Sequence, residues 1–571
     1  MASFTIILSF MSSWIPASFK PPSIASHNGD SNPLLPTNGG TSFDEDDEDY
    51  GIELEMQQFA VNDSTTARVR HNWPPRYTVV AVFGIVILVA TILLRSSSKS
   101  AGRSSVFPGP LLPGPVYDFW NVSNARIDTL FAAQSSTLAM AQARYALRNS
   151  RPPPPAYDKW YDFARGNSCL IDEYDQISRD FEPFYQLAQD DPVFFKKMIE
   201  LGSENVKKDG KGMTTGAFAG GRFSLTDNQS TLYTSEWPRT FERFSNWMPD
   251  MNVILNGRDE PRILFNYRKA DARPKALNVS DPTPFEHSPQ PTHSYFKDEM
   301  QCTIPNRPTG FTEPANDVSA FMLYASSTQF TIDLYPILSM TKISPCFADI
   351  LVPSEFYYSD SFWAPRYSHP NDINWADKTA KLYWRGMNSG GRMYDDNYHA
   401  FPRFRLIDIG RKHRKIMDVR LSGFHDDLCG ERCNGEAIEK EYDVAHISSP
   451  REDVYKYKYV FDVDGNSFSG RYLGLLRSGT LVFKSTVFLE YFGDWLRPFE
   501  HYIPVLPDLS DLVAKVEWAI AHDKEAQAIQ QAGQRFAERV LTDAQNDCYF
   551  SLVLLEWARL QGMADEVQAT E

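Results

Sequence analysis

The sequence predicts an α/β protein built around a doubly wound parallel sheet, and two segments carry this prediction. The segment Lys456–Lys484 has the pattern of a strand, a glycine loop, a short helix and a second strand, which is one right-handed crossover unit of such a sheet. A second crossover follows, with a short strand at His501–Val505 and a helix that begins near Asp508. The composition agrees with a globular protein, since 42% of the residues are hydrophobic and 23% are charged.

The charge balance excludes one class of partner. The 571-residue chain has 57 basic and 73 acidic side chains, which gives a net charge of −16. Nucleic acid is therefore not an expected partner, because phosphate binding favours clustered Lys and Arg. The six cysteines are too few for a disulfide scaffold, but their even number fits an oxidising compartment.

The N-terminal part is expected to hold a tail and a membrane anchor. Residues 1–76 include the acidic run Asp44–Asp49, which repels itself and cannot bury a core, so we expect a disordered cytosolic tail. Residues 77–94 are 18 positions without a charge, and about 27 Å of helix crosses a thin bilayer. A buried core helix is the alternative interpretation. Three basic residues precede the stretch and three follow it, so charge does not orient it.

Residues 95–155 are expected to form a stem. This segment begins rich in Gly and Pro, becomes helical from Ala125 to Leu147, and ends in the stiff run Arg151–Pro155. Asn-x-Ser acceptor sites in the chain, together with the even cysteine count, favour a lumenal carboxyl side and hence a type II protein. These sites are Asn121, Asn228 and Asn278.

The loop of the first crossover is the strongest candidate for an anion site. Gly465–Gly470 is small and polar, and Ser469 is placed to cap the following helix. Free backbone N–H groups and the helix dipole would both favour an anion here. Arg471 adds a two-pronged donor for phosphate oxygens. The pattern alone is equally compatible with a structural crossover that binds no ligand.

Two carboxylate motifs are weaker on their own. Asp462 and Asp464 have the Asp-x-Asp spacing with which many sugar-transfer enzymes hold Mn²⁺ or Mg²⁺, but Asp462 lies within the predicted strand, so we expect no metal. The strand Asn252–Leu255 delivers Asp259 to its carboxyl end, the edge at which ligands bind in open α/β sheets. The pattern by itself favours a turn residue at Asp259 over a catalytic base.

Taken together, four segments resemble the glycosyltransferase family 90 domain, which includes fungal capsule-associated xylosyltransferases and animal protein O-glucosyltransferases. They are PDMNVILNGRDEPR, LYWRGMNSGGR, KYKYVFDVDGNSFSGRYLGLLRSGTLVFK and WLRPFEHYIPVLPDLSDL, in that order. The resemblance covers Tyr157 to Gly562 and implies a GT-B architecture, with two Rossmann-like domains that face each other across a cleft. The acceptor-side lobe would be 156–375, and the UDP-sugar lobe would be 376–571 with returning terminal helices.

The resemblance also implies roles for single residues. Asp259 matches the family's general base, and Arg385 and Arg471 match its diphosphate-contacting arginines. The donor-binding turn would comprise Ser469, Gly470, Arg471, Tyr472, Leu473, Gly474 and Leu475. No metal and no other cofactor is implied. Cys548 falls where the family has a cysteine that ties the last helix to the amino-terminal part of the domain, which suggests Cys169 as its partner.

The expected function is therefore an inverting, metal-independent glycosyltransferase in the Golgi or ER membrane, single-pass and type II, with a lumenal catalytic domain. Its expected partners are a UDP-sugar donor, a glycan, polysaccharide or protein acceptor, and the lipid bilayer through residues 77–94. UDP-xylose is the favoured donor and UDP-glucose the other candidate. A lumenal glycan-binding protein with the same fold is the alternative. A glycosidase would need two carboxylates flanking one bond, and the sequence shows no recognisable pair.

Overall fold

The computed structural model joins two β-sheets and the helices around them into one folded unit, and it describes residues between Val116 and Gln568, with gaps. The described residues are 116–209, 212–226, 233, 236–263, 265, 286–287, 329–330, 334–344, 347–361, 373–391, 393, 395–430, 432–446 and 449–568. The predicted tail 1–76, the predicted anchor 77–94 and the acceptor sites Asn228 and Asn278 lie outside them. Among the described residues, no helix combines the length and the apolar character that a membrane crossing requires.

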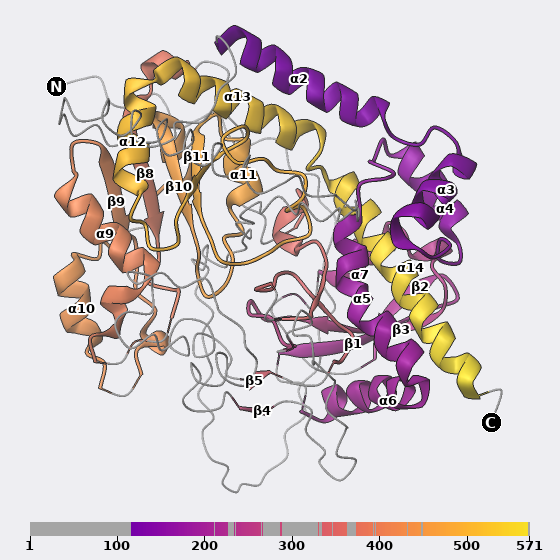
Figure 1. Ribbon diagram of the computed structural model, residues 1–571. Helices are drawn as coiled ribbons and strands as arrows, with labels where there is room; N and C mark the ends of the chain where they lie inside the picture. The colour runs from indigo at the N-terminus through magenta and orange to yellow at the C-terminus, as the bar shows by residue number, and fades with distance from the viewer. Residues whose placement is uncertain are drawn as a thin grey trace, which may run out of the picture. The chain divides into compact units, whose positions relative to one another are not determined.

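The fold is mixed α/β, with two five-stranded sheets that are rich in parallel pairs. The second sheet has the order β9-β8-β10-β11-β12, and all of its neighbouring strands are parallel (Figure 1). Its strands are β8 (Thr379–Gly386), β9 (Met417–Leu421), β10 (Tyr457–Val463), β11 (Leu481–Ser485) and β12 (Ile503–Val505). This confirms the parallel crossover units that the sequence predicts.

The strand order of the second sheet changes direction between β8 and β10. From β8 the chain passes through α9 (Pro402–Lys412) to β9 on one side, and then returns past β8 to β10 on the other side. After the carboxyl ends of β8 and β10, the chain therefore continues toward opposite sides of the sheet. Ligands of open α/β sheets bind at such a topological switch point.

The first sheet has the order β2-β1-β3-β6-β7, in which β3, β6 and β7 are parallel and β1 is antiparallel to both of its neighbours. Its strands are β1 (Met213–Ala219), β2 (Arg222–Leu225), β3 (Met251–Asn256), β6 (Ile337–Ser339) and β7 (Ile350–Leu351). A separate two-stranded pair consists of β4 (Glu286–His287) and β5 (Gln329–Phe330). Asp259 follows β3 by three residues, as predicted.

Helices from both ends of the described chain pack together beside the first sheet. The final helix α14 (Asp543–Gln568) contacts α4 (Tyr157–Gly166), α5 (Asp175–Asp190) and α6 (Pro192–Asp209) (Figure 1). Residues 548–555 of α14 are at most 2% exposed, because an α-helix that is apolar on all sides must be covered on all sides. A disulfide joins Cys169 to Cys548, which confirms the suggested pairing.

The other α-helices of the described residues lie before, within and after the two sheets along the chain. They are α2 (Val116–Ala132), α3 (Leu138–Asn149), α7 (Trp237–Glu242), α10 (Gly435–Tyr442), α11 (Tyr472–Leu476), α12 (Leu512–Ala521) and α13 (Asp523–Arg539). A second disulfide, Cys429–Cys433, closes a short loop immediately before α10.

Part of the expected stem is folded onto this unit. In place of one helix over Ala125–Leu147, the chain forms α2 and α3, which are separated by a break at 133–137. Helix α2 packs along α13, buries Phe119 and Ile127, and pairs Asp128 with Arg539. Residues 116–155 therefore belong to the globular structure, because the side chains that they bury find partners there rather than solvent.

Candidate active site

The loops that leave β8 and β10 meet at the switch point of the second sheet. The backbone N–H of Gly390 donates to Oδ1 of Asn466 at 3.2 Å. Gly390 has φ +114°, and a Cβ there would lie 3.3 Å from the carbonyl oxygen of Gly465. Only glycine adopts this conformation without strain, so the approach of the two loops depends on it.

Arg403, from the first turn of α9, fastens both loops. Its side chain is 0% exposed. Its Nε donates to the carbonyl oxygen of Asp464 at 2.9 Å, and Nη1 donates to the carbonyl of Met387 at 3.1 Å and to Oγ of Ser389 at 2.5 Å. The sequence analysis missed this residue. Its position in the helix could have identified it. A cation in the first turn is disfavoured by the helix dipole, so an arginine there indicates a specific interaction.

Arg471 lies at the same edge. Its Nη1 donates to the carbonyl oxygen of Arg385 at 2.7 Å. The guanidinium carbons of Arg403 and Arg471 lie 5.6 Å and 6.0 Å from the ring centre of the buried Trp384. Two cationic groups therefore share one indole at the switch point, which is an arrangement suited to an anionic ligand.

The side chain of Arg385 lies elsewhere. Its Nη2 pairs with Oδ1 of Asp418 at 2.7 Å, Nη1 donates to the backbone carbonyl of Asp418 at 2.9 Å, and the guanidinium stacks over Tyr383 at 4.6 Å. These contacts hold it over the face of β8 and β9. The structure thus brings Arg471, but not the Arg385 guanidinium, to the loop junction.

Ser469 is buried beneath the loop and does not cap α11. Its hydroxyl donates to Asp462, so the predicted cap is wrong; α11 begins at Tyr472 with Arg471 as its N-cap residue and has no side-chain cap. The other oxygen of Asp462 accepts from Nζ of Lys484 at 2.7 Å, and Asp462 is fully buried. The two Asp462 oxygens are therefore committed to Ser469 and Lys484, a purely internal role.

The rest of the predicted donor turn is largely core. The side chains of Tyr472, Leu473 and Leu475 are at most 3% exposed and pack in the main hydrophobic cluster. The ring centre of Tyr472 lies 4.3 Å from Nζ of Lys484. Gly470 is buried and Gly474 half-buried. These residues shape the backbone of the turn, so a ligand at the switch point would meet their main chain rather than the buried side chains.

Asp259, which follows β3, is a buried carboxylate whose pKa is raised. It is 4% exposed, and burial, reinforced by the neighbouring charge of Glu260, raises its pKa to about 8. Tyr233 donates from Oη to Oδ1 of Asp259 at 3.3 Å. Its other oxygen, Oδ2, has no hydrogen-bond partner among the described residues. Glu490 and Glu556 also each have a buried carboxylate oxygen without a partner in the described part of the chain, so it is the combination of this feature with a position just after β3 that marks Asp259 as a functional candidate.

A chain of aromatic rings connects Asp259 to the loop after β10. Tyr233 packs against Phe356, with ring centres 5.9 Å apart, and Phe356 packs edge-on against Phe468, with ring centres 5.8 Å apart. Phe356 lies in a short 3₁₀ turn, Glu355–Tyr357, and Phe468 immediately precedes Ser469. The structure therefore places the predicted base and the predicted donor loop at the two ends of a row of three aromatic rings. No pattern in the sequence pointed to Tyr233 or Phe356.

No group of three or more His, Cys, Asp or Glu side chains is arranged to hold a metal ion within the ranges described above. The Asp462–Lys484 pair shows why the Asp-x-Asp spacing is a poor guide here, since the ammonium of Lys484 takes the place that a cation would need. Metal independence itself stays a prediction.

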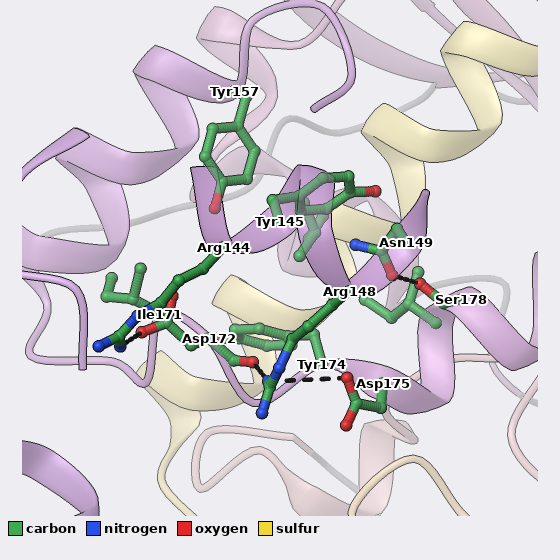
Figure 2. A pocket seen from close by; sticks show the side chains of 12 residues that line it. Arg144, Tyr145, Arg148, Asn149, Tyr157, Ile171, Asp172, Tyr174, Asp175 and Ser178 are labelled. Carbon is green, nitrogen blue, oxygen red and sulfur yellow. Dashed lines mark hydrogen bonds and ion pairs between the residues drawn. The ribbon is translucent and has the colours of Figure 1, made fainter. Parts of the chain in front are cut away.

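A small pocket between α3 and α5 lies apart from these residues (Figure 2). Its charged groups bind each other: Arg144 pairs with Asp172 at 2.7 Å, and Arg148 lies 3.6 Å from Asp175. Ser178 also donates to Asn149 across the pocket. These contacts attach α3 to α5, and the pocket is structural.

Comparison with known proteins finds similarity over the part of the chain that holds the second sheet. Residues 367–571 match Glycosyl transferase family 90, which bears out the resemblance found in the sequence. The chain is 34% identical over 188 residues to Protein O-glucosyltransferase 2 of Danio rerio, covering 33% of this chain and 34% of the relative. It is 31% identical over 196 residues to Protein O-glucosyltransferase 3 of Homo sapiens, covering 34% and 35%. The matched part thus spans about a third of the length of these relatives.

Proposed function

We propose, on the premise that residues 367–571 form a glycosyl transferase family 90 domain, that this chain is an inverting glycosyltransferase of GT-B architecture. It would transfer one sugar from a UDP-sugar to a glycan, polysaccharide or protein hydroxyl. Xylose and glucose are the candidate sugars, and the names of the relatives, which are protein O-glucosyltransferases, support glucose and a protein acceptor. The observation that carries the proposal is the unpartnered oxygen of Asp259, connected through three aromatic rings to the loop at the switch point.

Asp259 would act as the base. A sugar hydroxyl is a poor nucleophile near neutral pH, so a carboxylate must accept its proton during attack. The acceptor oxygen forms the new bond to the anomeric carbon, the bond from that carbon to UDP breaks, and UDP leaves with the electron pair. The proton goes to Oδ2 of Asp259. Inversion in one displacement needs only this one carboxylate.

Arg471 and the loop backbone would stabilise the leaving group. Negative charge develops on the diphosphate as the bond to the sugar breaks, and fixed donors aimed at that charge lower the barrier. Arg471 is held at the junction by its bond to the Arg385 carbonyl, and Arg403 fixes the two loops that meet there. These cations would neutralise the charge of the leaving diphosphate, which a divalent metal does in metal-dependent transferases.

The proposed location is the lumen of the Golgi or ER, with residues 77–94 as the anchor. Two disulfides, Cys169–Cys548 and Cys429–Cys433, support an oxidising compartment. Asn121, one of the predicted acceptor sites, is exposed on α2 and so accessible to a glycan.

The test is to incubate the purified full chain with a panel of UDP-sugars, with and without EDTA, and to measure UDP release and sugar transfer. We expect turnover with UDP-xylose or UDP-glucose that EDTA leaves unchanged. Loss of turnover in EDTA and its recovery with Mn²⁺ would contradict the metal-independent mechanism. Binding of glycans without any turnover would favour the alternative, a non-catalytic glycan-binding protein.

A further inference from the structure

The hydrogen bond between Tyr233 and Asp259 makes the two oxygens of the candidate base unequal. Oδ1 accepts from the Tyr233 hydroxyl at 3.3 Å, whereas Oδ2 has no partner among the described residues. A carboxylate whose one oxygen is already bonded can accept a proton on the other without rearranging. The asymmetry therefore selects Oδ2 as the reactive atom.

The ring of Tyr233 is held on two sides. It is 0% exposed, and its ring centre lies 6.4 Å from that of Trp237 on α7 and 5.9 Å from that of Phe356. Phe356 in turn contacts Phe468 of the donor loop. The position of the hydroxyl, and with it the orientation of the carboxylate, is thus fixed by packing that reaches the second sheet.

We infer that Tyr233 is a positioning residue: its hydroxyl orients Asp259 so that Oδ2 faces the acceptor, and its ring ties this orientation to the loop that would hold the donor. This inference rests on the proposed function, since it assigns a supporting residue to the proposed base. Tyr233 touches neither reacting atom in this role.

The charged and titratable groups that act on Asp259 are Glu260, Arg258, Arg262 and Tyr233. Of these, Glu260 disfavours the ionised carboxylate, while the two arginines and the Tyr233 hydrogen bond favour it. Removing only the hydroxyl of Tyr233 should therefore raise the pKa of Asp259 further, because a hydrogen bond to the charged form stabilises that form.

The experiment compares pH profiles of kcat/KM for the full chain and for Tyr233→Phe. We expect the acid limb of Tyr233→Phe to move to higher pH by about one unit, which is a tenfold loss of rate on that limb, with the donor KM within twofold of the parent. Tyr549→Phe is the matched control. Tyr549 is equally buried on α14, and its hydroxyl has no partner within the described ranges, so that variant should leave the limb unmoved.

A second substitution tests the same bond in the opposite direction. Site-specific 3-fluorotyrosine at position 233 keeps the shape of the side chain and makes its hydroxyl a stronger donor, so the acid limb should move to lower pH. This variant also serves if Tyr233→Phe folds poorly.

An unmoved acid limb in both variants, with Asp259→Asn inactive, would overturn the inference and leave the proposed function standing. Full activity of Asp259→Asn would instead remove Asp259 as the base, and with it the proposed mechanism. The two failures are therefore distinguishable.

Discussion

On the second sheet, the groups that would meet the donor are fixed by hydrogen bonds to the backbone; on the first sheet, the candidate base keeps an oxygen without a partner. Arg403 binds the carbonyls of Asp464 and Met387, and Arg471 binds that of Arg385. Asp259, by contrast, has one hydrogen bond from a hydroxyl, and its Oδ2 finds no partner among the described side chains and backbone.

This difference follows from what each side would do. Stabilising a leaving diphosphate requires donors that are already in place when charge develops, because reorganisation at that moment raises the barrier. A base requires the reverse: an acceptor that nothing else satisfies, with a pKa near the working pH. Burial beside Glu260 supplies the second property, since it raises the pKa of Asp259 to about 8.

The largest expected effect is on the base. Asp259→Asn removes the proton acceptor and keeps the shape, so transfer should fall by about 10²–10⁴-fold, the usual worth of general base catalysis. UDP affinity should stay within a fewfold, because Asp259 lies on the first sheet. The measurement is turnover together with UDP titration, and the matched control is Asp190→Asn, which changes an exposed carboxylate at the end of α5. Retained transfer in Asp259→Asn would contradict the assignment.

The second-largest expected effect is on UDP affinity, and it distinguishes Arg471 from Arg385. Arg471→Ala should weaken UDP binding by about 10- to 100-fold, since a hydrogen bond to a charged group contributes about 1.5–3 kcal/mol. Arg385→Ala should cost less, because the Arg385 guanidinium is paired with Asp418. Calorimetric titration with UDP would rank the two variants. An equal loss in both would mean that the Arg385 side chain leaves Asp418 to contact the diphosphate.

Substitution of Arg403 tests whether this side chain is needed to hold the two loops of the donor side together. Arg403→Lys cannot reach the Asp464 and Met387 carbonyls together, and each buried acceptor left without a donor costs about 1–3 kcal/mol. We expect a lower free energy of unfolding in urea and weaker UDP binding. Arg405→Lys, two residues further along the same helix and with Nη2 donating to the carbonyl oxygen of Asp508 at 3.0 Å, is the comparison, because this bond goes to a residue outside the two loops. Equal stability of Arg403→Lys and the parent chain would show that the loops do not need the clamp.

The smallest effect is a shift in pH dependence. Asp259 must be ionised to act, so kcat/KM should rise with pH and level off above about 8. Glu260→Gln removes the neighbouring charge, lowers the pKa of Asp259 and moves this limb to lower pH. Glu242→Gln, at an exposed position, should not move it.

The same titration has a consequence for stability. The folded pKa of Asp259 lies above the usual carboxyl value of 3.8, so between about pH 4 and 8 the folded state holds a proton that the unfolded state has lost. The contribution of Asp259 to stability therefore falls as pH rises through that window. Asp259→Asn should flatten this part of the curve in urea unfolding at a series of pH values.

Much of the second sheet could be predicted from the sequence, because its strands alternate or run apolar and its turns carry glycine. The segment from Lys456 to Lys484 contains a complete strand, loop, helix and strand, so local pattern alone specified β10, α11 and β11. The one local error, Ser469 as a helix cap, arose because Asp462 competes for the same hydroxyl. That competition depends on the side chain beneath the loop, which no cap rule considers.

The sequence by itself determined the elements of the parallel sheet, the position of Asp259 after a strand and the cysteines available for pairing, since these depend on residue type and spacing along the chain. Only the tertiary structure decided that Arg403 fastens both loops, that the guanidinium of Arg385 turns to Asp418, and that Tyr233 and Phe356 connect Asp259 to Phe468. The Arg403 and Arg385 contacts depend on which strands are neighbours in the second sheet, and the Tyr233–Phe356–Phe468 contacts depend on how the two sheets pack. Neither is set by a local preference.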